Sequence, residues 1–375
     1  MLICATFAEV MTTIGYVLIA VLCLMAMVVI HEFGHYIAGK ILGFKINEFA
    51  IGFGPRILKI TNKKNGEIFS IRPFPLGGFC QFEGEDDELD GETNPAAFNN
   101  QKPWKRLIVL FNGAFFNFLS AIILITLVFT FYGQILPVVG KVYEESYIGK
   151  NELLREGDVI LSVNGRQVNI LMQDDLQAAF KKVGDDGGTF TVLRDGEKIK
   201  IDVKRSTVFV RETDEDGNET IKIGEDGNPV TETAFGFAVG LAYVKIDFFS
   251  ALGRSFGYCF FMVYRILWSF VQLITGALSF RQNAGGPITI IKTMSNAVKS
   301  GPGILCYVVC IISANLAVMN LLPLPALDGS RMVFTIIEWI RKKPVSRKVE
   351  ATIHTVGIVI LFAIAILADI FQFLS

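Results

Sequence analysis

Four long uncharged apolar runs constrain the fold of this chain more than any other feature of its sequence. They cover residues 10–30, 107–140, 300–327 and 351–368. A transmembrane helix needs about 20 predominantly apolar residues to cross the hydrocarbon core of a bilayer. The composition agrees, because 51% of the residues are hydrophobic and 19% are charged, whereas about 25% are charged in soluble domains. The sequence therefore predicts a polytopic α-helical membrane protein with four transmembrane helices.

A fifth apolar segment, residues 255–280, differs from these four because Arg265 lies near its middle among Ser, Gln and Thr residues. A charged side chain at the centre of a bilayer costs at least about 2.5 kcal/mol. The segment is therefore predicted to be an interfacial amphipathic helix. The number of crossings gives a second reason. If this segment crossed the membrane, the 300–327 span would end on the opposite face from the first span.

Lysine and arginine residues are concentrated in two segments between the spans. Residues 39–106 contain ten of them and residues 330–350 contain six, whereas neither terminus has any nearby. Basic loops remain on the cytoplasmic side, so both termini are predicted to lie outside. The formal net charge of -1 leaves no basic face for nucleic acid, so no nucleic-acid partner is expected.

The longest segment without a span, residues 134–253, has the character of a soluble domain. Its first part, residues 134–206, reads as short strands separated by Gly-Asp and Asn-Gly turns. One amphipathic helix is expected in "MQDDLQAAFKK", where Leu176, Ala179 and Phe180 share a face. These patterns predict one extracytoplasmic α+β domain.

The first apolar run ends in the pattern His31-Glu32-Phe33-Gly34-His35. Residues four apart lie on one face of a helix, so both imidazoles can bind the same tetrahedral metal ion. The glutamate then lies beside the open position of the metal, where it can act as a general base toward water. Ionisable side chains inside a membrane persist mainly where function requires them. The pattern therefore predicts a zinc site with Glu32 as base, and a polar boundary between span and water is the alternative.

Two histidines leave such a site one protein ligand short, because catalytic zinc usually has three protein ligands and one water. His354, the only other histidine, lies at the start of the last span and is interpreted as an interfacial side chain. The stretch "NLLPLPALDG" offers a carboxylate instead. Pro323 and Pro325 break the helix and leave Asp328 free to turn toward the metal. Asp328 is the predicted third ligand, and an ordinary proline-rich exit turn is the alternative.

These motifs resemble those of the site-2 protease family of intramembrane zinc metalloproteases. The resemblance rests first on H-E-x-x-H at the end of the first span and N-x-x-P-x-P-x-L-D-G at the end of a later one. "FAIGFGPRIL" (49–58) and "FSIRPFPLGGFCQFEGE" (69–85) look like the membrane-dipping β segment of the family. "GGPITI" (285–290) matches the stretch ahead of its third span, and "REGDVILSVNG" (155–165) is similar to part of its PDZ module. The order of the segments is that of the bacterial branch that cleaves anti-sigma factors and remnant signal peptides.

The resemblance implies an intramembrane zinc endopeptidase that acts in regulated intramembrane proteolysis. Carried over by position, His31, His35 and Asp328 would bind one zinc ion and Glu32 would activate water. Asn320 would help to hold the substrate or the oxyanion. The implied partners are the lipid bilayer and single-span membrane protein substrates already cut by another protease. The implied location is the bacterial cytoplasmic (inner) membrane, with a PDZ-like domain outside.

The chain departs from the family pattern in two places. Where the family often has A-G-P-x-x-N, this chain has "NGAFFN" (112–117), which keeps Gly113 and Asn117 but lacks the proline. Ser330 stands where a second glycine is frequent after Asp328-Gly329. Neither departure replaces a ligand or the base, so both bear on the packing of the spans rather than on activity.

The predicted organisation has nine segments. These are a first transmembrane helix with H-E-x-x-H (1–38), a cytoplasmic loop with the re-entrant β segment (39–106), a second transmembrane helix (107–133), the PDZ-like domain (134–206), an extracytoplasmic connector (207–253), the interfacial helix and Gly-Pro-Ile stretch (254–299), a third transmembrane helix with Leu-Asp-Gly (300–329), a basic cytoplasmic loop (330–350) and a fourth transmembrane helix (351–375).

Two other functional classes are compatible with part of this pattern. A non-catalytic membrane adaptor with a PDZ domain and a structural metal site would explain the histidines, but a structural site needs no base such as Glu32. A metal transporter would be expected to show inverted repeats and polar residues on several spans, and the sequence has neither. Both alternatives make the role of Glu32 the feature to test.

Overall fold

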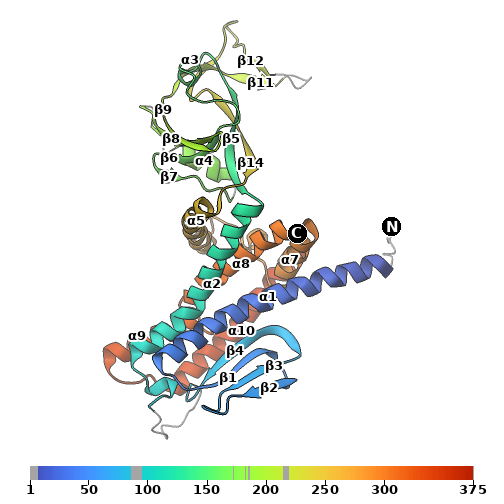
Figure 1. Cartoon of the computed structure of the whole chain (residues 1–375), viewed down its shortest axis with the longest axis vertical. Coiled ribbons are helices and arrows are strands. Elements are labelled where there is room, and N and C mark those ends of the chain that lie inside the picture. Colours follow the sequence, from blue (N-terminus) through green and yellow to red (C-terminus); the bar gives the residue numbers. More distant parts are fainter. Residues whose placement is uncertain are drawn as a thin grey trace. The chain divides into compact units, whose positions relative to one another are not determined.

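The computed structural model describes residues 7–85, 95–171, 173–181, 183–184, 186–213 and 219–374 (Figure 1). Contacts divide the chain into two compact units, each described here by itself. The helical unit comprises Met1–Ile125 and Cys259–Ser375, and the inserted unit comprises Thr126–Tyr258. Residues 86–94 of the predicted cytoplasmic loop lie outside the described residues.

The helical unit contains most of the long helices and one small sheet. Its elements are α1 (Phe7–Leu42), β1 (Ile46–Phe53), β2 (Leu58–Thr61), β3 (Ile68–Ile71), β4 (Phe74–Phe82), the short 3-10 helix Phe98–Asn100, α6 (Phe280–Asn283), α7 (Pro287–Ser300), α8 (Pro302–Leu321), α9 (Asp328–Arg341) and α10 (Arg347–Leu374). Two further helices, α2 (Pro103–Phe131) and α5 (Phe248–Thr275), each contribute residues to both units.

Five helices in the described part of the chain are long and apolar enough to cross a membrane, namely α1, α2, α5, α8 and α10. Four of them cover the predicted spans. The fifth, α5, covers the segment predicted to be interfacial, and it is the least hydropathic of the five. Length and composition do not separate a span from a long interfacial helix, so the count of four spans stays a prediction.

Helix boundaries differ from the predicted ones in three places. α1 continues to Leu42, beyond residue 38, so the H-E-x-x-H pattern lies inside a continuous helix. Residues 330–350, predicted as a basic loop, are mostly helix α9, because clustered basic residues indicate a side of the membrane and not the absence of a helix. Residues 287–300 form the separate helix α7, which begins with Pro287, a residue favoured in the first turn.

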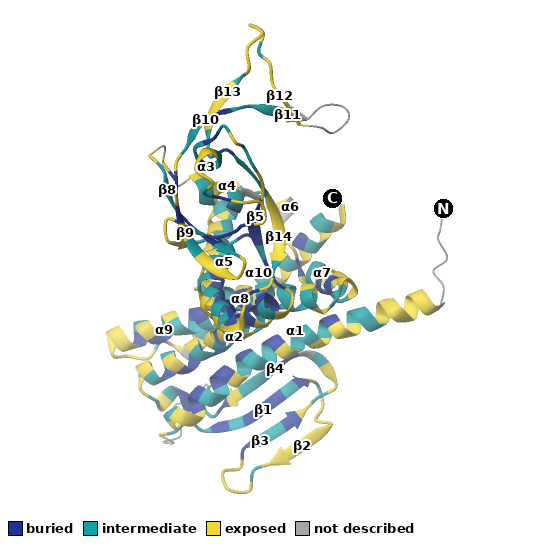
Figure 2. Ribbon diagram, turned by 45° about the horizontal axis from the view of Figure 1, so that its top comes forward, coloured by how far each residue is buried: buried dark blue, intermediate teal, exposed yellow. Residues whose placement is uncertain are grey.

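The sheet of the helical unit occupies the residues predicted as the re-entrant β segment. Its strand order is β2-β3-β1-β4, with β1 parallel to β3 and antiparallel to β4. All residues of the edge strand β2 are exposed, whereas most of β1 is buried (Figure 2). β4 forms the opposite edge and packs against α1. The sheet therefore presents one edge strand to the helix that carries the histidines.

Glycines allow α1 and α2 to approach each other closely. A Cβ atom added at Gly34 would lie 2.3 Å from the carbonyl oxygen of Asn112. Small residues at such contacts are typical of membrane helices, because backbone approach replaces the hydrophobic effect as the source of packing energy. The close contact fixes α2 against the face of α1 on which the histidines lie.

The inserted unit is built on a sheet with strand order β14-β5-β6-β8-β9, to which β7 adds by pairing with β6. Its elements are β5 (Gln134–Val142), α3 (Tyr147–Lys150), β6 (Val159–Val163), β7 (Arg166–Gln167), α4 (Gln173–Lys181), β8 (Gly188–Arg194), β9 (Glu197–Val203), β10 (Ser206–Phe209), β11 (Arg211–Thr213), β12 (Glu219–Ile221), β13 (Thr231–Ala234) and β14 (Phe237–Val244). The expected strands and single amphipathic helix are present, and the PDZ identity of the unit stays a prediction.

The sheet of the inserted unit extends beyond the predicted boundary at residue 206. β14 lies within the segment predicted as a connector, yet it pairs with β5 from Phe237 to Val244. Phe237 also packs against the apolar core around Phe190, with Leu176 and Phe180 of α4. The pairing partner of β14 lies about a hundred residues earlier in the chain, so local patterns gave no sign of it.

Candidate metal centre

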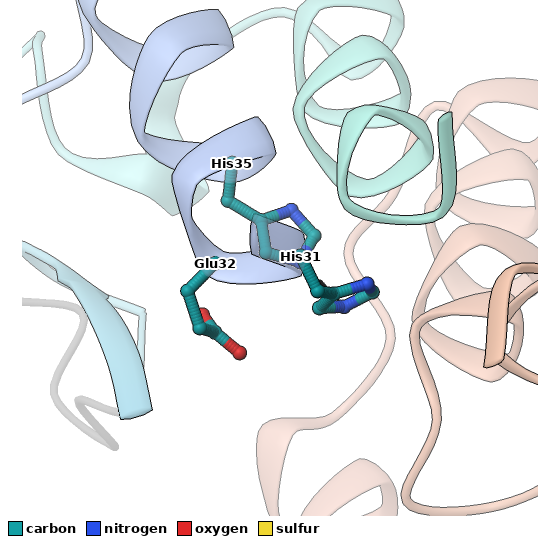
Figure 3. Close-up of side chains that lie close together, drawn as sticks. All are labelled: His31, Glu32 and His35. Atoms are coloured by element: carbon teal, nitrogen blue, oxygen red, sulfur yellow. Dashed lines mark hydrogen bonds between the residues drawn. The ribbon is translucent and has the colours of Figure 1, made fainter. Parts of the chain in front are cut away.

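His31, Glu32 and His35 all lie in the continuous helix α1, with the two histidines four residues apart on one face. Both histidines are buried, with 7% and 6% of their surfaces exposed. Figure 3 shows the two imidazoles on one side of α1 and the Glu32 carboxylate pointing elsewhere. Ligand-type atoms of the three residues still lie within 4.8 Å of one another. The spacing therefore places the two candidate metal ligands on one face of the helix and leaves the Glu32 carboxylate beside them.

Asp328 joins the two histidines from the first turn of α9. Its Oδ2 lies 2.9 Å from Nε2 of His31 and 3.2 Å from Nε2 of His35, and the two Nε2 atoms are 3.1 Å apart. Three ligand-type atoms, two on imidazoles and one on a carboxylate, thus face one another.

The size of this triangle matches a zinc ion. Donor atoms around a tetrahedral zinc with bonds of about 2.0–2.1 Å lie about 3.3 Å from one another. The observed separations are 2.9 to 3.2 Å. Two imidazoles and one carboxylate are also a donor set found in catalytic zinc sites, which keep a fourth position open. The residues present therefore fit zinc in number, kind and spacing.

A backbone carbonyl fixes the orientation of one histidine. His35 Nδ1 lies 2.8 Å from the carbonyl oxygen of Val109 in α2. A carbonyl can only accept, so Nδ1 carries the proton and the neutral ring keeps its lone pair on Nε2, the atom that faces Asp328. Such outer contacts are a common way to set the tautomer of a metal-binding histidine. The second ring is different, because Nδ1 of His31 is buried and has no partner among the described residues.

Gly113 of α2 lies directly against the two imidazole rings. A Cβ atom added there would lie 2.5 Å from Nε2 of His35 and 2.6 Å from Cε1 of His31. Any side chain would displace the rings or occupy the space between them. This contact explains why "NGAFFN" needs its glycine, whatever the effect of the missing proline.

The turn before Asp328 follows from its two prolines. α8 ends at Leu321, ahead of Pro323, and Asp328 is the first residue of α9. The helix start packs against the end of α8, since a Cβ at Gly329 would lie 2.2 Å from the carbonyl oxygen of Leu322. Ser330, the serine that departs from the family pattern, has a hydrogen-bond partner nearby in the chain. Its Oγ donates to the carbonyl of Leu327 at 2.9 Å.

Glu32 is held by the edge strand of the small sheet. The backbone N–H of Cys80, in β4, donates to Oε2 of Glu32 at 3.0 Å. Burial, and secondly the Glu32 carboxylate, raise the pKa of the Cys80 thiol. The contact that Cys80 makes with Glu32 is through its backbone N–H.

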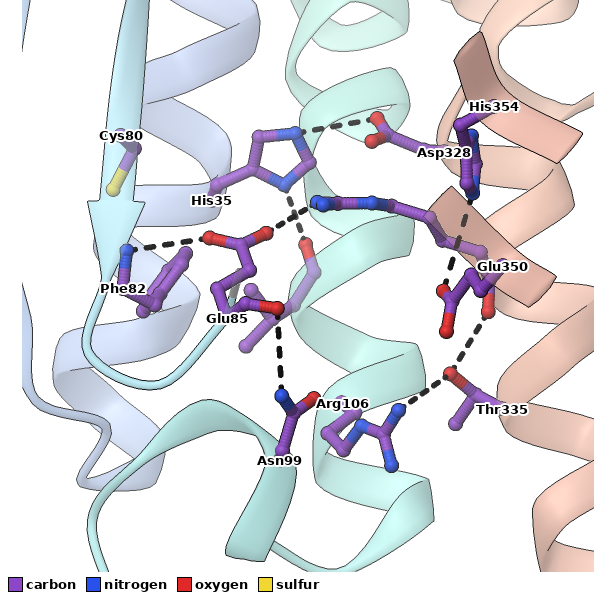
Figure 4. Close-up of polar contacts among 12 residues, drawn as sticks. His35, Cys80, Phe82, Glu85, Asn99, Arg106, Asp328, Thr335, Glu350 and His354 are labelled. Atoms are coloured by element: carbon purple, nitrogen blue, oxygen red, sulfur yellow. Dashed lines mark hydrogen bonds and ion pairs between the residues drawn. The ribbon is translucent and has the colours of Figure 1, made fainter. Parts of the chain in front are cut away.

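A cavity of about 390 Å³ opens beside these groups. It is lined by Glu32, His35, Phe79, Cys80, Gln81, Phe82, Glu85, Phe98, Val109, Leu110, Asp328 and Arg331. Figure 4 shows Glu85 beside Phe82 at the end of β4, and the guanidinium of Arg331 pairs with the Glu85 carboxylate. The same carboxylate accepts from the backbone N–H of Phe82 at 3.3 Å. The cavity therefore joins the edge of β4, the metal-binding triangle and a charged rim.

The structure brings together four of the five residues singled out from the sequence. His31, His35, Asp328 and Glu32 meet at one end of α1, whereas Asn320 lies in the last turn of α8 and is not among the residues that line the cavity. Sequence reasoning missed two contributions, the Val109 carbonyl and the Cys80 N–H. Backbone groups have no residue-type signature, so no sequence signal could have identified them.

Comparison with known proteins agrees with this site. Peptidase family M50 matches residues 19–364 of the chain. A "Putative zinc metalloprotease" of Clostridium perfringens is 28% identical over 95% of this chain and 97% of its own length. Proteins with the same description from Fusobacterium nucleatum and Nostoc sp. are each 30% identical, over 92% and 93% of this chain and 94% and 93% of theirs.

The family match and the apolar helices together make the chain an integral membrane protein. Its H-E-x-x-H motif lies within the matched region, and the relatives it resembles over nearly its full length are described as putative zinc metalloproteases. The chain therefore belongs to peptidase family M50, the zinc metalloproteases of the site-2 protease type.

Proposed function

We propose that this metalloprotease cleaves the transmembrane segments of single-span membrane proteins. The observation that supports the proposal is the position of the triangle of His31, His35 and Asp328. The two histidines lie in α1, which is apolar enough to cross a membrane, and Asp328 follows the turn after α8, a second such helix. Polar groups at such a place must be shielded by protein, and both histidines are buried. A hydrolytic site enclosed by membrane helices suits a peptide bond that lies in the membrane itself.

The assigned roles follow the geometry. His31, His35 and Asp328 bind a single zinc ion, which when bound supplies Lewis acidity toward water and the scissile carbonyl. Glu32 takes a proton from the attacking water and returns it to the leaving amine. The Cys80 N–H keeps the Glu32 carboxylate near the metal-binding atoms. Asn320 is proposed to hold the substrate or the oxyanion.

Substrate is proposed to bind as an added strand. A transmembrane helix must be unwound locally before its carbonyl can be attacked, and the unwound backbone then needs hydrogen-bond partners. β4 is an edge strand, and its residues 79–82 line the cavity that also contains Glu32. Addition of an extended peptide to a sheet edge is a recurring mode of recognition. β4 is therefore the proposed template for the cleaved segment.

The inserted unit is proposed to select substrates that another protease has already shortened, such as anti-sigma factors or remnant signal peptides in regulated intramembrane proteolysis. Binding of peptide carboxylates by a PDZ-like groove is the alternative use. A chain in which residues 134–244 are replaced by a short linker is expected to cut longer, uncleaved precursors. This deletion removes the whole sheet, because β14 pairs with β5. If the deletion variant still prefers shortened substrates, the inserted unit does not select substrates by size.

The proposed location is the bacterial cytoplasmic membrane, with both termini and the inserted unit outside. α1 and α8 both end near the metal-binding triangle, which supports spans that run in the same direction. α5 would then lie at the outer surface or dip in and return. Single cysteines placed by Asn283→Cys and Lys343→Cys, in a cysteine-free background, are expected to label from outside and from the cytoplasm respectively. Cytoplasmic labelling at 283 would contradict this topology.

Zinc analysis and proteolysis by purified protein test the catalytic proposal. The substrate is a fluorescent single-span peptide that lacks an outer domain, and wild type is compared with Glu32→Gln. The variant is expected to retain zinc and to lose about 10²- to 10⁴-fold in kcat, the usual contribution of a general base. Wild-type cleavage by Glu32→Gln would reject the base assignment. Absence of cleavage by zinc-loaded wild type would favour the adaptor with a structural metal.

A further inference from the structure

The turn that carries Asp328 contains a residue in an unfavourable backbone conformation. Ala326 has a φ angle of 76°, in the left-handed region that residues with a Cβ atom rarely occupy. Such conformations persist only where surrounding contacts hold them. Ala326 is two residues before Asp328, so whatever holds it also bears on the direction of the carboxylate.

Hydrogen bonding within the turn is limited by its composition. Pro323 and Pro325 have no N–H to donate. The N–H groups of Leu324 and Leu327 donate within the turn, to the carbonyls of Leu322 and Leu324. Ala326 is different, because its N–H donates to Nδ1 of His354 in α10 at 2.9 Å. Ala326 is thus the described residue of the turn whose N–H donates to a different helix.

α10 contacts the turn at a second point on the same face. Gly357 lies one turn after His354, and a Cβ atom added there would lie 2.1 Å from Cβ of Pro325. His354 itself is half-buried, with its ring 5.9 Å from that of Phe334 in α9. Figure 4 shows His354 on α10 beside the start of α9, where Asp328 lies. The face of α10 formed by His354 and Gly357 therefore fits the turn closely.

The chemistry of this contact assigns a definite state to the ring. A nitrogen that accepts from a backbone N–H has no proton, so the neutral His354 ring carries its proton on Nε2. The acceptor is the δ-position atom of the side chain, which an asparagine can reproduce with Oδ1 and a glutamine cannot. A residue that merely filled space would show no such preference.

We propose that His354 is a positioning residue that directs Asp328 toward the two histidines by holding Ala326 in its left-handed conformation. The inference rests on the proposed function, because it takes Asp328 to be a zinc ligand. It adds a role within the fold to His354, which the sequence alone predicts to be an interfacial side chain. His354 does not touch the metal-binding atoms, and its effect passes through the two residues that separate Ala326 from Asp328.

The test measures zinc affinity in the purified full-length protein by competition with a chromophoric chelator. The variants are His354→Ala, His354→Asn and His354→Gln, with Thr355→Ala as an exposed control in the same helical turn. Loss of a contact that orients a metal ligand typically weakens binding about 10- to 100-fold, and this loss is expected for alanine and glutamine. Asparagine and the Thr355 control are expected to bind zinc like the wild type. Thermal unfolding of each variant identifies any that fail to fold.

Two results would overturn the inference. Wild-type zinc affinity in folded His354→Ala or His354→Gln would remove the positioning role, as would equal losses for asparagine and glutamine. Asp328→Ala separates this failure from that of the proposed function. If Asp328→Ala binds zinc like the wild type, the ligand assignment itself is wrong. If Asp328→Ala loses zinc and the His354 variants do not, only the positioning inference fails.

Discussion

The helical unit and the inserted unit differ in how many of their large apolar side chains are exposed. In the inserted unit, apolar side chains such as Phe190 and Ile160 are completely buried. The helical unit has buried apolar clusters as well, but large apolar side chains on its helices, such as Leu18 and Phe362, are 56% and 63% exposed, whereas His31 is buried. The apolar surface of the helical unit therefore suits lipid, and part of its interior is polar.

This difference follows from the surroundings of each unit. Burial of apolar surface in water stabilises a fold by about 25 cal/mol per Å², but lipid tails offer apolar side chains the same environment as a protein interior. Packing of the helical unit must depend instead on close contacts and polar pairs. One such pair links α2 to α9, where Arg106 donates to Glu338 at 2.6 Å with both side chains buried. The same kinds of contact build the metal centre.

The largest effect on stability is expected in the inserted unit. Phe190→Ala removes a completely buried aromatic ring and should cost about 3–5 kcal/mol. Hydrogen exchange measured by mass spectrometry should show faster exchange in residues 134–244, while zinc binding stays unchanged. The exposed neighbour Lys200→Ala is the control and should change stability by less than about 0.5 kcal/mol. Loss of zinc in Phe190→Ala would show that the two units do not behave independently.

The matching change in the helical unit is His35→Ala. Zinc binding is worth about 10–16 kcal/mol in sites with four protein ligands, so one ligand contributes about 2.5–4 kcal/mol. Zinc affinity should therefore fall about 10²- to 10³-fold, and proteolysis at limiting zinc should fall with it. Exchange in residues 134–244 should not change. Retention of zinc by His35→Ala would mean that the triangle of His31, His35 and Asp328 is not the metal site.

The sequence predicted which side chains of the candidate metal centre lie together better than it predicted the packing around them. The four-residue spacing of His31 and His35 requires only a helix, and the two prolines before Asp328 require a break. Both are local properties, and the structure brings the three side chains within 3.2 Å of one another. The Val109 carbonyl and the Cys80 N–H were not predictable, because every residue has these groups and only the tertiary fold selects among them.

Pairing over long distances explains the remaining differences. β14 completes a sheet that begins at β5, about a hundred residues earlier, so the last strand of the predicted run, which ends near residue 206, suggested a domain end that the sheet passes. α9 was missed for another reason. Its basic residues were interpreted as evidence of a cytoplasmic loop, although Arg331 and Arg341 belong to a continuous helix. Charge indicates the side of the membrane and says little about local structure.

A smaller effect on zinc affinity is expected at Gly113, where α2 packs directly against the histidine rings. Its Cβ position lies 2.5 Å from the His35 ring, so Gly113→Ala should push a ligand aside and weaken zinc binding about 10- to 100-fold, as outer contacts of metal sites typically do. Gly15→Ala is the matched control, because a Cβ atom there meets nothing within 4 Å. Equal zinc affinities for the two variants would show that α2 can move away from the histidine rings without disturbing zinc binding.

The smallest effect is expected at Glu48, a buried carboxylate in β1 of the helical unit. Its polar contacts should make the stability of the sheet depend on pH. Burial would raise its pKa, but hydrogen bonds from Arg56, Arg72 and Ser70 outweigh burial and lower the pKa to about 2. The folded sheet therefore binds fewer protons than the unfolded chain. Its stability is fully present above about pH 4.5, the ordinary pKa of the group, and is lost as the pH falls toward about 2.

Replacement of the carboxylate should remove this pH dependence. Glu48→Gln loses charge-assisted hydrogen bonds worth about 1.5–3 kcal/mol in general, and the lower value is expected because the Arg56 side chain is 40% exposed. Melting temperatures followed by circular dichroism between pH 7 and pH 2 should show no contribution from this group above about pH 4.5, and below it a steeper fall for the wild type than for the variant. The two curves should approach each other toward pH 2, where the folded wild-type carboxylate becomes protonated. Parallel curves would mean that the buried pairs of this sheet do not contribute to its stability through charge.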